Sequence, residues 1–143
     1  MRLWSNDFAE GQPIPSKCSY RHENQRPHLA WDDIPPETRS FAIMCNDPDA
    51  PVGDWIHWLV HSVPVGVHEI KPEAQVPGIQ IQNDFGIQNW GGPAPPFGTH
   101  RYVFSIYALS VPALETVDKN CFKELCEKHK IAVAKTMGTY TRK

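Results

Sequence analysis

The segment that most constrains the fold is residues 90–102, which read WGGPAPPFGTHRY and hold three Gly and three Pro. Proline fixes φ and lacks a backbone donor, and glycine tolerates φ > 0, so the first part of this segment predicts a stiff loop. Residues 100–109 (HRYVFSIYAL) are aromatic and β-branched, which is typical of a strand. Because side chains alternate along a strand, we expect His100 and Tyr102 on one face and Arg101 on the other.

A second group of ionisable side chains lies upstream, between two further strand-like segments. Residues 40–46 (SFAIMCN) are mostly apolar in succession, which favours a strand covered on both faces. The acidic turn DPDAP (47–51) follows directly, and residues 53–63 (GDWIHWLVHSV) are again typical of a strand. Loops at strand ends are common places for binding groups, so the two polar loops predict one shared site.

Two histidines lie on the strand predicted at 53–63. Strict alternation would put Trp55, His57, Leu59 and His61 on one face of it. His57 and His61 would then be about 13 Å apart, too far to share one small ligand. At most one of them therefore belongs to the site, and we expect His61 to be structural.

Weaker patterns complete the expected elements. Apolar residues recur at helical spacing from Phe122 to His129, after the candidate N-cap Asp118, and predict an amphipathic helix of about three turns. His22 and His28 fall in an irregular polar segment, where we expect solvated loop residues. The other expected strands cover residues 3–8, 29–31 and 78–82, the last at a sheet edge, and residues 131–141 are either a last strand or irregular.

Length and composition predict one domain, residues 1–143, with a loop-rich β architecture, because 41% of the chain is apolar and 14 residues are Pro. The net charge of −2 and the absence of a dense Lys/Arg cluster argue against nucleic acid and anionic membranes as partners. We expect no membrane insertion, since no apolar stretch approaches the length of a span. Without a secretory pattern or a CxxC pair, the expected location is cytoplasmic.

The motifs DPDAP, GDWIHWLV and GGPAPPFGTHRYVFSIYAL, in this order, resemble the phosphatidylethanolamine-binding protein family in its short bacterial, Raf kinase inhibitor-like form. The flanking segments FAEGQPIP, NDFG and GTYTR agree, so the resemblance covers nearly the whole chain. It implies a mainly β fold in which a central antiparallel sheet packs on a second smaller sheet, with one or two short C-terminal helices. The bacterial members also suggest a homodimer, which the sequence alone leaves open.

The resemblance further implies a pocket for a small anion, with no metal or other cofactor. In such a pocket two imidazoles and a phenol would donate hydrogen bonds, and backbone exposed by a glycine would add N–H donors. Transferred position by position, the ligand-binding residues would be Asp47, Pro51, His57, Gly92, Pro93, Pro95, His100 and Tyr102.

The expected pocket lacks a strong phosphate ligand, because Arg101 faces away and is expected to pair within the protein. Affinity should therefore be modest compared with a bidentate arginine clamp. Asp47 would repel a bare dianion unless it bonds a protonated oxygen, orients a histidine or meets an ammonium. These constraints favour a phosphate monoester or a phosphoethanolamine-type headgroup, bound more tightly as the histidines protonate below about pH 6.5.

Two classes of function remain open at this point. The first is a non-catalytic binding module that regulates or inhibits a protein partner, for which eukaryotic relatives suggest a kinase or a protease. The second is a metal-dependent enzyme with Asp47, Asp49, His57 and His100 as ligands, although no HxH or HxxxH pair supports it.

Overall fold

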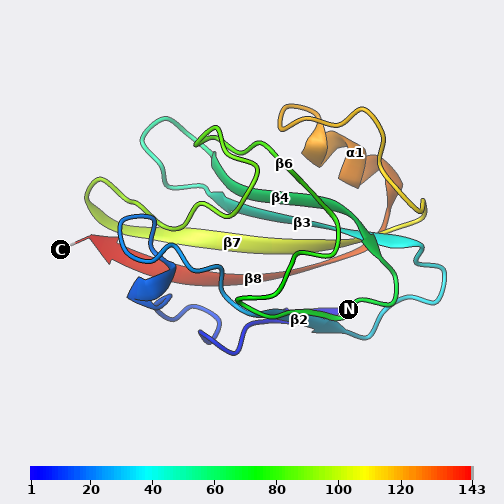
Figure 1. The fold of residues 1–143 in the computed structure, drawn as a ribbon, viewed down its shortest axis with the longest axis horizontal. Coiled ribbons are helices and arrows are strands. Elements are labelled where there is room, and N and C mark those ends of the chain that lie inside the picture. Colours follow the sequence, from blue (N-terminus) through cyan, green and yellow to red (C-terminus); the bar gives the residue numbers. More distant parts are fainter. Residues whose placement is uncertain (143) are drawn as a thin grey trace.

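The computed structural model describes residues 1–142 and contains two antiparallel sheets (Figure 1). The larger has five strands in the order β6-β4-β3-β7-β8, and the smaller has three in the order β1-β2-β5. The predicted mainly β architecture, a central sheet packed on a smaller one, is confirmed. The strands are β1 (Arg2–Trp4), β2 (Leu29–Asp32), β3 (Ser40–Asp47), β4 (Trp55–Pro64), β5 (Glu69–Ile70), β6 (Ile79–Ile81), β7 (Gly98–Leu109) and β8 (Lys130–Arg142).

Helical structure in residues 1–142 is limited to a 3-10 turn, η1 (Ser16–Cys18), and one α-helix, α1 (Phe122–His129). The α-helix is shorter than predicted, and its N-cap is Cys121 rather than Asp118. The Asp118 carboxylate instead accepts two backbone N–H groups, at 2.9 and 3.1 Å, in the turn that precedes the helix. No helix in this part of the chain is both long and apolar enough to cross a membrane.

Strand β3 is covered on both faces, as its apolar run predicts. Phe41, Ile43 and Cys45 point into the core between the two sheets, whereas Ala42 and Met44 belong to a second core that the sheet shares with α1. The larger sheet is therefore the middle layer, with the smaller sheet on one side and the helix on the other (Figure 1).

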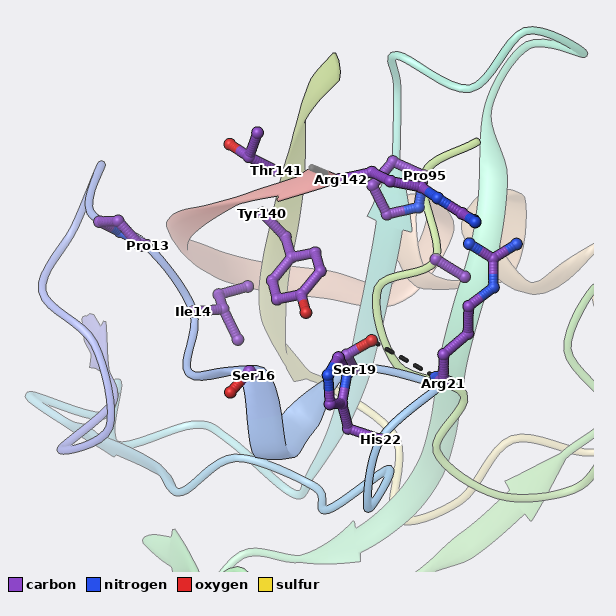
Figure 2. A pocket seen from close by; sticks show the side chains of 11 residues that line it. Pro13, Ile14, Ser16, Ser19, Arg21, His22, Pro95, Tyr140, Thr141 and Arg142 are labelled. Atoms are coloured by element: carbon purple, nitrogen blue, oxygen red, sulfur yellow. Dashed lines mark hydrogen bonds between the residues drawn. The ribbon is translucent and has the colours of Figure 1, made fainter. Parts of the chain in front are cut away.

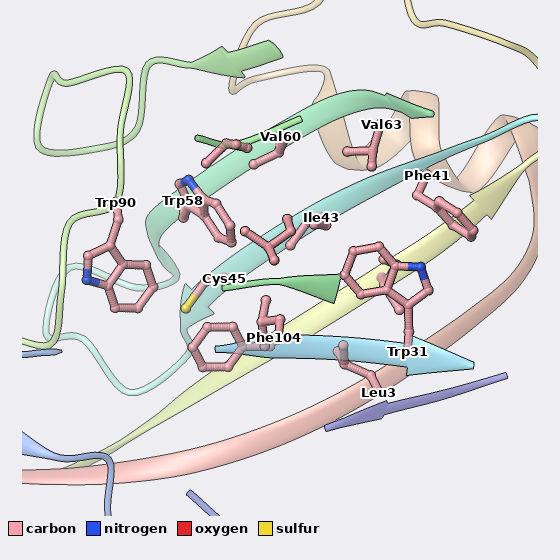
Figure 3. Packing of buried hydrophobic residues seen from close by; sticks show 14 of the residues in the cluster. Leu3, Trp31, Phe41, Ile43, Cys45, Trp58, Val60, Val63, Trp90 and Phe104 are labelled. Atoms are coloured by element: carbon pink, nitrogen blue, oxygen red, sulfur yellow. The ribbon is translucent and has the colours of Figure 1, made fainter. Parts of the chain in front are cut away.

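The core between the sheets also anchors the Gly/Pro-rich loop. Trp31 of β2 packs against Phe41 of β3, with ring centroids 5.6 Å apart (Figure 3). Trp90, the first residue of the loop, is only 2% exposed. Its ring stacks on Phe104 at 5.9 Å and meets Trp58 edge-on at 6.1 Å (Figure 3). The loop thus starts from a fixed point in the core.

Two expectations about the N-terminal part of the chain are wrong. The first strand ends at Trp4 rather than at residue 8. His28 is buried, and both ring nitrogens have partners: Nδ1 accepts the Asn6 N–H at 2.9 Å and Nε2 donates to Glu69 at 2.7 Å. A histidine with two such partners is structural, whereas His22 is exposed as predicted. At the other end of the chain the ambiguous tail is resolved as the strand β8, which pairs with β7.

A β-bulge in β4 overturns the strict alternation expected there. Cys45 pairs with Trp58, but the next residue of β3, Asn46, pairs with Ile56, so His57 is an extra residue in the ladder. Trp58 then faces the core between the sheets and Leu59 faces the helix side. Because of the bulge, His57 lies on the same side as Trp58, which alternation alone forbids.

The Gly/Pro-rich loop is seated on the segment around η1 by close backbone packing. A Cβ on Gly92 would lie 1.8 Å from the carbonyl oxygen of Cys18. The Gly92 N–H donates to Asn24 Oδ1 at 2.7 Å. The next carbonyl, of Pro93, accepts the Tyr20 N–H at 3.0 Å and the Ser19 hydroxyl at 3.1 Å. Gly92 is therefore required by backbone packing and has no free N–H to offer a ligand.

We predict that Gly92→Ala destabilises the protein by about 2–4 kcal/mol, since the methyl group meets backbone that cannot rotate away. The free energy of unfolding, measured by urea titration, tests this. Gly66→Ala is the matched control, because a Cβ there meets nothing within 4 Å, and its effect should stay within about 0.5 kcal/mol. Equal effects of the two substitutions would contradict the proposed seating of the loop.

Candidate functional site

A cavity of about 280 Å³ lies at the end of the larger sheet where β3 finishes and β7 begins. The antiparallel pairing of these strands brings the DPDAP turn next to the start of β7. Five of the eight sequence-predicted site residues line the cavity: Asp47, Pro51, His57, Pro95 and His100. The two polar loops thus meet in one place, and the role of these residues in binding stays a prediction.

A buried hydrogen bond joins Asp47 and His100 at the floor of this cavity. The Nδ1–H of His100 donates to Asp47 Oδ2 at 2.7 Å, and the two residues are 6% and 3% exposed. The other oxygen, Asp47 Oδ1, accepts the backbone N–H of Asp49 at 2.8 Å. Of the three roles considered for Asp47, the structure shows that it orients a histidine.

His57 is held in the same manner by a backbone carbonyl. Its Nδ1–H donates to the Gly91 oxygen at 2.6 Å, and the Gly91 N–H donates back to the His57 carbonyl at 3.1 Å. The ring meets Tyr102 edge-on at 5.1 Å and Phe85 at 5.3 Å. Burial lowers the pKa of His57 below its ordinary value, so the ring is neutral near pH 7.

Both cavity histidines therefore use Nδ1 inside the protein, which leaves Nε2 as the nitrogen of each ring available to a ligand. A neutral imidazole whose proton is on Nδ1 is an acceptor at Nε2 and becomes a donor there only when protonated. The two imidazoles expected to donate to an anion would therefore do so at Nε2 only in their protonated form. His61 does not join them, since it is buried elsewhere with its Nδ1 2.8 Å from Ser62 Oγ.

Three of the sequence-predicted residues lie behind the cavity wall. Tyr102 is fully buried under His57, and its hydroxyl has no hydrogen-bond partner within residues 1–142. Burial, and then the charge of Asp47, raise the pKa of Tyr102 well above its ordinary value, so the phenol stays protonated. Gly92 and Pro93 contact the segment around η1 instead. They support the wall without lining it.

The cavity also has an aromatic side that the sequence did not reveal. Trp55 and Phe85 both line it, with ring centroids 5.6 Å apart, and Phe85 stacks on Tyr20 at 4.4 Å. Alternation had placed Trp55 on the face of His57, which was a usable signal. Phe85 arrives from a loop, and no local pattern points it towards this cavity. Ala50, Val52, Ala94 and Pro96 complete the lining.

The second acid of the DPDAP turn, Asp49, faces outward and is the partner of Arg101, which was expected to pair within the protein. The Arg101 side chain donates to both Asp49 oxygens, at 2.8 and 2.9 Å, and this contact lowers the pKa of Asp49 to about 2. Asp49 is thus engaged outside the cavity. Among residues 1–142 no group of three or more His, Cys, Asp or Glu is arranged to hold a metal ion.

We predict that Asp49→Asn costs up to about 1 kcal/mol at pH 7, the usual limit for an exposed ion pair. Because the folded-state pKa of Asp49 is lowered, the stabilisation exists above the ordinary pKa of 3.8 and is lost as the pH falls towards 2. Urea midpoints of wild type and variant at pH 7, 4 and 3 check this. Glu10→Gln, at an exposed position, is the control, and a difference that grows on acidification would contradict the pairing.

Comparison with known proteins identifies the class to which this two-sheet fold and its imidazole-lined cavity belong. A sequence profile described as phosphatidylethanolamine-binding protein matches residues 4–141. A UPF0098 protein of Methanothermobacter thermautotrophicus is 39% identical over 99% of each chain. The UPF0098 protein YbhB of Escherichia coli is 38% identical over 80% of this chain and 82% of its own.

Solved structures agree with the sequence comparison. A putative phosphatidylethanolamine-binding protein homologue from Chlamydia trachomatis superposes with a TM-score of 0.92 at 36% identity, covering 99% of this chain and 97% of the other. Escherichia coli YbcL, described as a new member of the mammalian PEBP family, gives a TM-score of 0.92 at 27% identity, over 99% and 98%. The chain belongs to the phosphatidylethanolamine-binding protein family.

Proposed function

We propose that this protein is a non-catalytic binding module for a small anion, of the phosphate monoester or phosphoethanolamine type, and that it regulates a protein partner. The observation that carries the proposal is the fixed orientation of His57 and His100, each held at Nδ1 and each lining the same cavity. Protonation would convert both Nε2 atoms into donors for one phosphate group. The Asp47 carboxylate is in place to balance the charge of a doubly protonated His100 ring.

The aromatic side of the cavity favours a zwitterion over a bare phosphate. No Lys or Arg of the part of the chain that the structure describes lines the cavity, so the phosphate would meet only imidazoles and affinity should be modest. The ammonium of phosphoethanolamine would suit the aromatic rings of Trp55 and Phe85, which attract cations at their faces. A headgroup of this kind would use both sides of the cavity.

Occupancy of the cavity would then act on a partner through its rim. Val52 is 78% exposed and Phe97 is 69% exposed, and both residues flank the proline residues that form the cavity wall. A partner that docks over these apolar side chains would sense whether a ligand lies beneath them. The partner, a kinase or a protease by analogy with eukaryotic relatives, and a cytoplasmic location remain parts of the proposal.

We predict that O-phosphorylethanolamine binds more tightly as the pH falls from 8 to 5, by at least about tenfold. Affinity rises on acidification because the histidines must take up protons before Nε2 can donate to the phosphate. Burial lowers the pKa of His57, so this ring takes up its proton at a lower pH than an ordinary histidine. Isothermal titration calorimetry in two buffers of different ionisation enthalpy measures both affinity and proton uptake. Ethanolamine O-sulfate, whose charge stays constant over this range, separates titration of the protein from titration of the ligand.

Variants assign the effect to the cavity. His57→Ala and His100→Ala should each abolish measurable binding, whereas His68→Ala, at an exposed position just before β5, should leave it unchanged. An affinity that does not change between pH 5 and pH 8, or binding that is retained in both cavity variants, would contradict the proposal. The same titrations with added zinc would show whether a metal, rather than the protons, engages the two rings.

A further inference from the structure

Figure 2 shows a second and larger pocket, of about 660 Å³. It shares Ala94 and Pro95 with the first cavity. It lies between the N-terminal segment, the Gly/Pro-rich loop and the end of β8. A volume of this size is typical of small-molecule sites. None of the residues predicted from the sequence as ligand-binding belongs to it except Pro95.

The walls of this pocket are held by backbone hydrogen bonds. Ile14 N–H donates to the Thr139 carbonyl at 2.7 Å, and Thr139 N–H donates to the Gln12 carbonyl at 3.0 Å, so the N-terminal segment is bound alongside β8. Gly138 makes this approach feasible, because a Cβ there would lie 2.5 Å from the Ile14 side chain. The opposite wall is the Gly/Pro-rich loop, which is fixed by the contacts of Gly92. The pocket is therefore preformed.

One rim of the pocket carries two arginines that form no ion pair with any residue from 1 to 142. Figure 2 shows the side chains of Arg21 and Arg142 directed towards the same rim, and His22 also lines the pocket. None of the described residues that line the pocket is acidic. Within residues 1–142, neither arginine has a carboxylate oxygen within 4.0 Å, although Arg2 and Arg101 are paired in this way. In a chain of net charge −2, two converging arginines without acidic partners suit an anionic ligand.

The interior of the pocket is largely apolar. Ile14 is only 2% exposed, and the ring of Tyr140 lies beside it, as Figure 2 shows. Pro13 and Pro95 extend this surface. The Ser19 hydroxyl already donates to the Pro93 carbonyl, so it adds little polarity. A ligand that fills the pocket would therefore need an apolar body in addition to its charge.

We propose that this pocket is a second binding site, for an amphipathic organic anion with an apolar or aromatic body and a phosphate or carboxylate head. Arg21 and Arg142 hold the head, and Ile14 and Tyr140 contact the body. The site does not depend on the proposed function of the first cavity, since it uses guanidinium groups in place of imidazoles. Its concave shape and limited volume favour a small molecule over an acidic peptide.

The test titrates the full chain with 1-naphthyl phosphate and follows the Ile14 methyl and Tyr140 ring signals by NMR. Arg21→Gln and Arg142→Gln should each weaken binding about tenfold, as expected when one charge-assisted contact is lost. Arg39→Gln is the matched control, because it removes the same charge from an exposed position outside both pockets. Inorganic phosphate has the charge without the aromatic body, and 1-naphthol has the aromatic body without the charge. Both should bind much more weakly than 1-naphthyl phosphate.

The outcomes are separable from those for the first cavity. His57→Ala should leave the ligand-induced shifts of Ile14 and Tyr140 intact, whatever it does to O-phosphorylethanolamine binding. Naphthyl phosphate binding that His57→Ala abolishes but the two arginine substitutions spare would overturn the proposal. So would equal binding of 1-naphthol, equal binding of inorganic phosphate, or no shift at Ile14. Arginine-dependent binding of hexaglutamate without binding of naphthyl phosphate would assign the surface to an acidic peptide instead.

Discussion

The seating of the Gly/Pro-rich loop on the segment around η1 is the contact on which the rest of the site depends. Gly92 lies so close to the Cys18 carbonyl that no side chain fits, and this contact fixes the neighbouring Gly91 carbonyl. That carbonyl accepts the Nδ1 proton of His57 and so sets which nitrogen faces the cavity. The same loop supplies Pro95 to both pockets. One backbone contact therefore determines the shape of two potential binding sites.

Burial of charge explains the order of residues in the DPDAP turn. A carboxylate as buried as that of Asp47 is costly unless its oxygens accept hydrogen bonds, and Asp49 N–H and His100 provide them. The backbone N–H of Asp49 donates to the Asp47 carboxylate, while the Asp49 side chain turns outward and accepts hydrogen bonds from Arg101. The first acid thus orients a histidine, and the second holds the turn to β7. Asp47 and Asp49 are two positions apart and have different roles because Asp47 is buried and Asp49 faces solvent.

The sequence predicted the fold well wherever the period of the side chains is unbroken. Alternation along residues 100–109 placed His100 and Tyr102 correctly on the inner face, because β7 has no irregularity near its start. The same argument failed for His57, since a β-bulge is a property of the pairing of two strands. Gly92 shows another limit. A glycine allows either a ligand or a neighbouring backbone segment to approach it closely, and only the tertiary structure shows that the Cys18 backbone approaches Gly92.

Partners that are distant in the sequence set the remaining limits of prediction. His28 was expected in solvent because its segment is polar and irregular, and its acceptor, Glu69, lies 41 residues further along the chain. The second pocket joins residues near 14, 94 and 140, which come from three segments far apart in the sequence. Such groupings arise from the packing of the N-terminal segment on β8 and cannot be found from periodicity or spacing.

The central claim of this account is that Asp47 and Gly91 hold both cavity histidines by Nδ1, so that Nε2 faces the ligand. Long-range ¹H–¹⁵N correlation spectra of the ligand-free protein measure the position of the ring protons directly. His28 is an internal reference of the opposite kind, because its Nδ1 accepts a hydrogen bond and its Nε2 donates one. We predict a proton fixed on Nδ1 of His57 and of His100. A neutral ring with its proton on Nε2 at either position, or rapid averaging between the two nitrogens, would contradict the account.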